Sequence, residues 1–392
     1  MSQKTRILFY GQEPYKPDKG GIGSYINHRA FLLSQNGFEV WWSNDYEYCR
    51  FDEVNLIWQT PVAIVKLSKI LSFLGSFYFN YSSCWKSALN NIQPDIIEFP
   101  DGHTSLLPKK TNIRFVLQCH TSINLRFFLN REKLSILRKL RATINLYRQN
   151  IVLKQVDSIL ACSNEIANLE GGFHHIHPDY VTILYHYFSK VAEPIVFNKN
   201  NDIDPFFLVV GNFEYFKGFD LVLRAYETYK HSGGLNKLIF AGNKGWSDGQ
   251  FQKEWGGNKD VIRIKNSIIA NSIEFVGTIS KDELSHYRKN ATAVIIASRF
   301  EAFTMVAGEC LLSNTPMIIS DRTGWTRIIE RFNCARLVSP YNLNDFSNAM
   351  FDMENKSFRE TLKTNALRAM EYITGEDLKN DTINYYKNII NS

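Results

Sequence analysis

Short apolar runs alternate with helix-like stretches along this chain, and the alternation starts again in its second half. RILFY at 6–10 ends at a glycine and precedes a helical pattern, and FFLVV at 206–210 does the same. Further apolar runs lie at 38–45, 94–101, 114–122, 156–163 and 180–188, and then at 235–245, 272–280, 292–301 and 315–321. Such runs favour buried parallel strands, and their alternation with helices favours α/β domains. The pattern predicts two Rossmann-like parallel-sheet α/β domains that face each other across a cleft.

The length of the chain and a polar stretch near its middle place the domain boundary. A chain of 392 residues exceeds what one hydrophobic core usually supports, so two domains are expected. The stretch 189–205 is polar and contains two prolines and several asparagines, as linkers do. We therefore expect a first domain over 1–188, a linker over 189–204 and a second domain over 205–372. A last helix is expected over 373–392, where it can pack back on the first domain.

Composition limits the class of protein. Hydrophobic residues make up 44% and charged residues 21% of the chain, as in folded globular proteins. The net charge of +6 is compatible with an anionic partner but is too small to indicate nucleic acid. The six cysteines form no C-x-x-C pair, and no signal peptide or membrane-spanning run is recognisable. These features lead us to expect a reduced, cytoplasmic protein.

Several polar and glycine-rich segments directly follow the expected strands. In open parallel sheets, ligands bind beyond the carboxyl ends of the strands. The residues placed there are Gly20, Gly21, Gly23, Asp101, His120, the loop from Gly211 to Gly218, Gly277 and the segment that begins at Glu301. KGGIG at 19–23 lacks the G-x-G-x-x-G spacing of dinucleotide-binding proteins. By itself that segment is best interpreted as an ordinary turn.

Two side chains in these segments suggest a role in ligand binding or catalysis. Lys217 opens a helix, where the helix dipole is already positive, so a phosphate opposite it would explain its position. A solvated surface lysine is an equally good explanation. His120 ends a strand, which favours a functional role over the structural role that lone histidines usually have. The histidines at 174, 175 and 177 have no carboxylate or cysteine at ligand spacing, so no metal site is expected there.

Two glutamates with seven residues between them carry the most information. Glu301 follows a strand, and Glu309 lies in an apolar run, where a carboxylate is costly unless something bonds to it. A helix that starts near residue 305 would direct the free N–H groups of 303–305 at an anion. Glu309 could then accept hydrogen bonds from a ribose diol and Glu301 from another polyol, which suggests a nucleotide sugar. An ion pair between Glu309 and an arginine such as Arg327 is the alternative.

Nearly the whole chain resembles the family 4 glycosyltransferases, which are retaining enzymes with two Rossmann-like domains in the GT-B arrangement. The specific part is SRFEAFTMVAGECLLSNTPMIISDRTG at 298–324, which contains the two glutamates followed by Pro316 and Gly324. Looser matches occur in the expected order at Gly20-Gly21, 95–101, His120, 209–223 and 273–284. The resemblance implies an N-terminal acceptor domain and a C-terminal domain that binds the nucleotide-sugar donor.

The resemblance also implies a role for each matching residue. Catalytic roles fall to Glu301 on the transferred sugar, Lys217 on the diphosphate and His120 near the reacting centre. Donor-binding roles fall to Gly20, Gly21, Asn212, Thr278, Phe303, Thr304, Met305 and Glu309, of which Glu309 would hold the ribose, and Asp101 is a candidate on the acceptor side. Asn212 replaces an arginine that is usual in the family, and Thr304 and Thr323 replace glycines. The missing arginine removes one phosphate-binding cation unless Arg299 or another cation substitutes.

These roles imply transfer from a UDP- or GDP-linked donor to a glycan or lipid-linked acceptor, in cell-surface polysaccharide or lipopolysaccharide synthesis. No cofactor and no metal are expected, because no convincing Asp-x-Asp element follows a strand and NDIDP at 201–205 lies in the linker. Three alternatives stay open: a sugar-nucleotide epimerase on the same fold, a non-catalytic nucleotide-sugar-binding protein and a dinucleotide-dependent oxidoreductase. Only the α/β pattern and Asp45 favour the oxidoreductase.

A basic segment in the first half suggests a surface partner. Arg126 to Lys154 contains eight basic residues and one acidic residue, Glu132. Apolar residues recur there at helical spacing, at Leu137, Leu140, Ile144, Tyr147 and Ile151. One interpretation is a core-packed helix with a basic solvated face. The other is docking on an anionic membrane surface, which would make the protein peripheral at the inner face of the plasma membrane.

Overall fold

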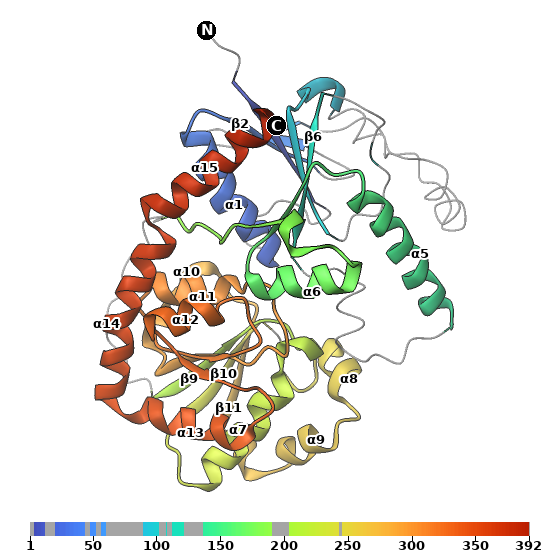
Figure 1. Cartoon of the computed structure of the whole chain (residues 1–392). Helices are drawn as coiled ribbons and strands as arrows, with labels where there is room; N and C mark the ends of the chain where they lie inside the picture. Colours follow the sequence, from blue (N-terminus) through green and yellow to red (C-terminus); the bar gives the residue numbers. More distant parts are fainter. Residues whose placement is uncertain are drawn as a thin grey trace. The chain divides into compact units, whose positions relative to one another are not determined.

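A computed structural model describes residues 4–11, 20–43, 48–51, 56–59, 89–101, 107, 112–120, 136–189, 204–242 and 245–391 (Figure 1). The chain divides into two compact units. The first contains Met1–Ser189 together with Thr374–Ser392, and the second contains Lys190–Ile373. Each unit is built around a sheet of its own.

The sheet of the second unit is entirely parallel. Its strands are β9 (Phe206–Val210), β10 (Lys237–Ala241), β11 (Ile273–Gly277), β12 (Ala293–Ile296), β13 (Met317–Ser320) and β14 (Arg336–Val338). Their order is β11-β10-β9-β12-β13-β14, which is the 3-2-1-4-5-6 order of a Rossmann domain. A topological switch point therefore lies between the carboxyl ends of β9 and β12.

Helices cover both faces of this sheet because each presents an apolar stripe to it. They are α7 (Phe219–His231), α8 (Gly249–Trp255), α9 (Lys259–Lys265), α10 (Lys281–Asn290), α11 (Met305–Leu312), α12 (Thr326–Phe332), α13 (Leu343–Glu354) and α14 (Lys356–Ile373). In Figure 1, α7 and α13 lie side by side, and α10, α11 and α12 lie on the opposite side of the labelled strands. Tyr226 and Tyr229 of α7 share one buried cluster with Phe346 and Met350 of α13.

The sheet of the first unit has eight strands and is mixed. The strands are β1 (Arg6–Tyr10), β2 (Glu39–Ser43), β3 (Tyr48–Phe51), β4 (Leu56–Gln59), β5 (Ile96–Pro100), β6 (Arg114–Cys119), β7 (Ser158–Ala161) and β8 (Val181–Ile183). Their order is β4-β3-β2-β1-β5-β6-β7-β8, and only the β2–β3 and β3–β4 pairs are antiparallel. The sequence prediction lacks β3 and β4, because runs of four residues give little periodic signal.

The last helix of the chain belongs to the first unit. The named helices of this unit are α1 (Gly20–Gln35), α5 (Ile136–Leu153), α6 (Asn164–His174) and α15 (Glu376–Asn391). Tyr385 on α15 donates a hydrogen bond to Ser158 Oγ in β7 at 2.8 Å, and Tyr386 is fully buried. The helix therefore packs through its tyrosines onto the first sheet.

The apolar stripe expected on the basic helix is not its packed face. α5 covers the later part of the predicted segment, and residues 126–135 lie outside the described residues. The side chains of Leu140 and Tyr147 are 56% and 68% exposed, whereas Gln149 is buried. The Gln149 amide donates to the carbonyl of Asp101 at 2.5 Å, and Val152 of the same helix is also buried. The interpretation in which Leu140 and Tyr147 pack into the core is therefore wrong.

The two sheets confirm the predicted α/β fold class, because every predicted strand run contains a strand. Most of the expected linker, at 190–203, lies outside the described residues. The described cysteines, at 49, 119, 162, 310 and 334, are buried, and none forms a disulfide with another described cysteine. No helix in the described part of the chain is long and apolar enough to cross a membrane.

Candidate functional site

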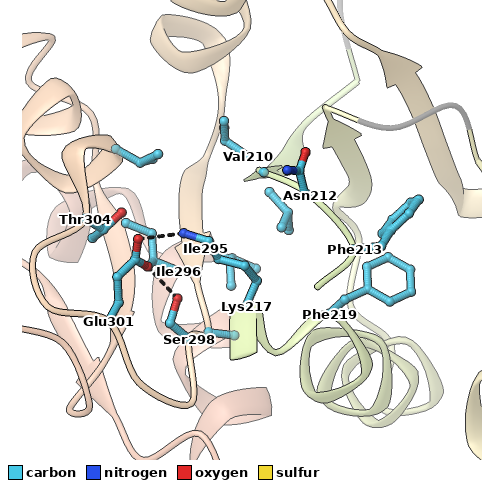
Figure 2. A pocket seen from close by; sticks show the side chains of 14 residues that line it. Val210, Asn212, Phe213, Lys217, Phe219, Ile295, Ile296, Ser298, Glu301 and Thr304 are labelled. Atoms are coloured by element: carbon cyan, nitrogen blue, oxygen red, sulfur yellow. Dashed lines mark hydrogen bonds and ion pairs between the residues drawn. The ribbon is translucent and has the colours of Figure 1, made fainter. Parts of the chain in front are cut away.

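A pocket opens at the topological switch point of the second unit. Residues 209–213 line it at the end of β9, and residues 295–298 line it at the end of β12. Lys217, Glu301 and Thr304 lie around the same pocket (Figure 2). The pocket is open to solvent. Since ligands of open parallel α/β sheets bind at this point, the pocket is the candidate site.

Lys217 and Glu301 face each other in this pocket. Lys217 Nζ lies 2.5 Å from Glu301 Oε1, and Ser298 Oγ donates to Glu301 Oε2 at 2.8 Å (Figure 2). The lysine and glutamate side chains are 28% and 17% exposed, so the pair is only partly screened by water. An ammonium group suits a phosphate, and a carboxylate suits hydroxyl groups. The pair therefore offers both kinds of contact to one ligand.

A glycine allows Lys217 to reach this position. Gly218 has a φ of 71°, in the left-handed region. A Cβ atom at Gly218 would lie 2.1 Å from the carbonyl oxygen of Ala297, so only glycine lets the loop after β9 approach the end of β12 so closely. The short 3-10 turn η2 (Tyr215–Lys217) thus brings the ammonium group to Glu301.

The N-terminus of α11 borders the same pocket. Thr304 is its N-cap residue, and Phe303 precedes it. The Trp325 ring stacks on Phe303 with the centroids 4.3 Å apart, and Trp325 Nε1–H donates to the Thr304 carbonyl at 2.8 Å. These contacts fix the turn that starts the helix. The first N–H groups of a helix lack intrahelical partners, which gives this edge of the pocket a positive partial charge.

Arg299 does not replace the arginine that is missing at position 212. Its guanidinium group donates two hydrogen bonds to the Asp220 carboxylate, at 2.9 and 2.6 Å, and its Cζ lies 3.9 Å from the centroid of the Tyr215 ring. The charged side chains of Arg299 and Asp220 are 9% and 8% exposed. Asn212 itself is exposed at the pocket. Among the described residues that line the pocket, Lys217 is therefore the cation.

Glu309 is less buried than its apolar neighbours suggest, and it has a partner. Its side chain is 31% exposed, and its Oε2 accepts a hydrogen bond from Arg288 Nη2 at 2.6 Å. Glu309 therefore forms an ion pair with an arginine, as the alternative interpretation expected, but this arginine is Arg288 of α10 and not Arg327. Within the described part of the chain, Oε1 of Glu309 has no hydrogen-bond partner, so the pair leaves one oxygen for a ligand.

The structure groups some of the expected donor-binding residues and separates others. Those that line the pocket are Asn212, Lys217, Glu301 and Thr304. Those in the same unit that do not line it are Thr278, Phe303, Met305 and Glu309. Thr278 is exposed beyond the end of β11, where its Oγ1 donates to the Gly242 carbonyl at 3.5 Å. The pocket thus contains Lys217, Glu301 and Thr304 of the diphosphate and sugar candidates, but not the ribose and base candidates Glu309 and Thr278.

The remaining expected residues belong to the first unit. Asp101 is buried just after β5, and its Oδ2 accepts the backbone N–H of His120 at 3.0 Å. The His120 ring packs edge-on against Tyr25 with the centroids 4.8 Å apart. Gly20 and Gly21 begin α1, the helix that carries Tyr25. Asp101 therefore fixes the backbone at His120, a structural contact that the sequence did not reveal.

Sequence reasoning missed a buried polar cluster next to His120. Glu98 in β5 accepts hydrogen bonds from the hydroxyls of Tyr25, at 2.5 Å, and of Tyr386. Arg29 donates to the Tyr386 hydroxyl at 3.3 Å. Glu98 and Arg29 are each 2% exposed, and burial raises the pKa of the Glu98 carboxyl. A carboxylate inside the apolar strand run IIEFP is the same kind of anomaly as Glu309, and it could have revealed this cluster.

Family models match both units of the chain. Residues 193–369 match the model described as "Glycosyl transferases group 1", and residues 19–186 match "Glycosyltransferase Family 4". An uncharacterized glycosyltransferase of Methanocaldococcus jannaschii is 24% identical over 370 residues, which are 90% of this chain and 90% of that protein. A D-inositol 3-phosphate glycosyltransferase of Nocardioides sp. is 28% identical over 116 residues, so the match spans 29% of this chain and only 25% of that relative.

Solved structures show the same architecture. Sucrose-phosphate synthase from Thermosynechococcus elongatus superposes with a TM-score of 0.73 at 15% sequence identity, over 98% of this chain and 99% of that one. Identity at this level shows the fold alone. The two sheets and this likeness define the GT-B fold, and the matched family models show that the chain is a glycosyltransferase. Because the two matched models together span both units, the chain belongs to the family 4 glycosyltransferases.

Proposed function

We propose that the protein transfers a sugar, with retention of anomeric configuration, from a nucleoside-diphosphate sugar to a glycan or lipid-linked acceptor. The observation that supports this is the convergence of Lys217, Glu301 and the N-terminus of α11 in one pocket. Lys217 and the helix N-terminus bind the diphosphate, and Glu301 binds hydroxyls of the transferred sugar. Glu309 binds the ribose through its second carboxylate oxygen, and the donor is UDP- or GDP-linked.

In the proposed reaction, charge develops on the diphosphate as its bond to the anomeric carbon breaks. Lys217 rests on Glu301 without a donor, and it moves onto a phosphate oxygen when the donor binds. Glu301 is then free to accept hydrogen bonds from the sugar, while Ser298 keeps its other oxygen in place. The acceptor oxygen forms the new bond on the face that the diphosphate leaves. Its proton passes to a phosphate oxygen of the leaving group, which gives retention.

We further propose that this reaction needs no metal ion. The ammonium group of Lys217 and the N–H groups at the start of α11 supply the positive charge that stabilises the leaving diphosphate. Transfer should therefore continue at full rate in excess EDTA. Loss of activity in EDTA, restored by manganese or magnesium, would contradict this part of the proposal.

Binding measurements test the proposed site. Thermal-shift screening of UDP, GDP, ADP and their sugars identifies the donor, and calorimetry then compares wild-type with Lys217→Ala. A hydrogen bond to a charged group contributes about 1.5–3 kcal/mol, so we expect roughly ten- to a hundredfold weaker binding. The control is Lys237→Ala, because Lys237 is 47% exposed, pairs with Asp204 at 2.6 Å and does not line the pocket. A folded Lys217→Ala protein with wild-type affinity would overturn the assignment.

The acceptor is proposed to lie at a membrane, in cell-surface polysaccharide or lipopolysaccharide synthesis. α5 presents the exposed apolar side chains of Leu140 and Tyr147, and Lys154 follows the helix as an exposed base. Exposed apolar groups near basic residues suit the surface of an anionic leaflet. The exposure of Leu140 and Tyr147 therefore supports a peripheral location at a membrane.

A further inference from the structure

Thr304 has a hydroxyl group that the fold itself does not use. Its side chain is 2% exposed and lines the pocket. Among the described residues it makes no hydrogen bond, and it does not cap the helix that it precedes. A threonine at this position normally accepts a hydrogen bond from the second or third N–H of the helix, and buried polar groups are normally paired. A hydroxyl without a partner, on a residue that is only 2% exposed and lines a pocket, points to a ligand.

The backbone at Thr304 does not force this arrangement. Its φ of −72° and ψ of 124° are ordinary extended values, from which N-cap side chains usually do bond to the helix. The Trp325 indole holds the Thr304 carbonyl, and its ring stacks on Phe303, so the turn is fixed from the side of the core. Figure 2 shows the Thr304 side chain close to Glu301 at the wall of the pocket.

Thr304 and Glu301 have complementary hydrogen-bonding capacities. A carboxylate only accepts hydrogen bonds, whereas a threonine hydroxyl can also donate one. A sugar hydroxyl does both, so it can donate to Glu301 and accept from Thr304 at the same time. A phosphate oxygen only accepts, and Lys217 and the first N–H groups of α11 are already placed to serve it.

We propose that Thr304 is a specificity-determining residue whose hydroxyl donates a hydrogen bond to the transferred sugar, next to the hydroxyls that Glu301 accepts from. The inference rests on the proposed function, and it concerns the side chain of Thr304 rather than its backbone. Its ligand class is the glycosyl group of a nucleoside-diphosphate sugar. The bare nucleoside diphosphate should not use this contact.

The test compares Thr304→Val, which keeps the shape and removes the hydroxyl, with Thr304→Ser, which keeps the hydroxyl. Calorimetry measures the affinity of each protein for UDP and UDP-glucose, or for GDP and GDP-mannose if guanine nucleotides stabilise the wild-type protein more. Thr304→Val should bind the sugar conjugate about three- to tenfold more weakly than wild-type. It should bind the bare diphosphate as wild-type does, and Thr304→Ser should match wild-type for both ligands.

A matched control separates binding from stability. Thr292 lies just before β12, at the end of that strand away from the pocket, and its Oγ1 donates to Asn236 Oδ1 at 2.5 Å. Thr292→Val should therefore lower the melting temperature and leave both affinities unchanged. Thr304→Val should keep the melting temperature, since it removes no hydrogen bond within the described protein, and should lose affinity only for the sugar conjugate.

Two results would overturn the inference while the proposed function stands. One is wild-type affinity of Thr304→Val for the sugar conjugate. The other is an equal loss for the conjugate and the bare diphosphate, which would place the hydroxyl on a phosphate. Failure of the wild-type protein to bind any of these ligands is a different result, because it removes the proposed function and the inference with it.

Discussion

Replacing Arg288 with glutamine tests whether Arg288 holds Glu309 in position for the ribose of the proposed donor. Arg288 Nη2 donates to Glu309 Oε2 at 2.6 Å, and the two side chains are 9% and 31% exposed. The change leaves a carboxylate that water reaches over about a third of its surface. Unpairing a buried charge costs about 3–5 kcal/mol, and an exposed ion pair contributes about 0–1 kcal/mol. We expect the free energy of unfolding to fall by about 1–2 kcal/mol, between these limits.

The effect on ligand binding is separate from the effect on stability. In the proposed site, Glu309 Oε1 accepts from the ribose of the donor only while the carboxylate keeps its orientation. A charged hydrogen bond contributes about 1.5–3 kcal/mol, and loss of half of it weakens binding about three- to tenfold. Calorimetry with UDP, 2′-deoxy-UDP and 3′-deoxy-UDP measures this contribution. The wild-type preference for the ribose form should shrink in Arg288→Gln.

Arg336→Gln is the matched control. Arg336 pairs with Asp345 at 2.7 Å and with Asp352 at 2.9 Å, is 28% exposed and does not line the pocket. This variant should lose stability but keep the wild-type preference for ribose. The positioning role of Arg288 is refuted if folded Arg288→Gln discriminates against the deoxy nucleotides as strongly as wild-type does.

Three further predictions concern the first unit. Tyr386→Phe deletes the hydroxyl that donates to Glu98 and accepts from Arg29, so denaturation in urea should show a loss of about 1–3 kcal/mol; an unchanged unfolding free energy would contradict the stabilising role of the cluster. Burial lowers the pKa of His186 well below its ordinary value of 6.5, so the stability from keeping this ring neutral is present above pH 6.5 and is lost as the pH falls below it. His186→Gln should flatten the fall in melting temperature between about pH 6.5 and 5, and identical slopes in both proteins would exclude this cause. The protein should sediment with anionic but not neutral liposomes at 0.1 M salt and should be released at 1 M salt, because the screening length falls from about 10 Å to about 3 Å. Leu140→Asp should weaken this binding, and a protein that stays in the supernatant at low salt would exclude the membrane proposal.

The centre of the site was predictable because its residues directly follow expected strands of one parallel domain, whose carboxyl ends carry the ligand site. Lys217 and Glu301 are 84 residues apart, yet each follows a strand of one Rossmann domain. In that topology β9 and β12 are neighbours, so their following loops meet at one edge of the sheet. The apolar setting of Glu309 likewise indicated correctly that the carboxylate needs a partner.

Which side chains pair with one another was not predictable, because contacts between different helices and strands leave no periodic pattern in the sequence. Arg288 lies 21 residues before Glu309 on a different helix, and nothing in its own segment marks it. Glu98 and Tyr386 are 288 residues apart and meet only because the last helix packs on the first sheet. On α5, Gln149 and Val152 are buried whereas Leu140 and Tyr147 are exposed, so the inward face does not follow the apolar spacing along the helix.

Following the anomeric centre of the donor tests the proposed reaction most directly. Wild-type protein is mixed with the α-linked nucleoside-diphosphate sugar that it binds best, without an acceptor, and slow hydrolysis is followed by proton NMR before the free sugar mutarotates. We predict release of the nucleoside diphosphate, an α-anomer as the first free sugar, and a strongly reduced rate in Lys217→Ala. A β-anomer as the first product would contradict retention. A nucleotide-linked epimer without released diphosphate would contradict sugar transfer itself.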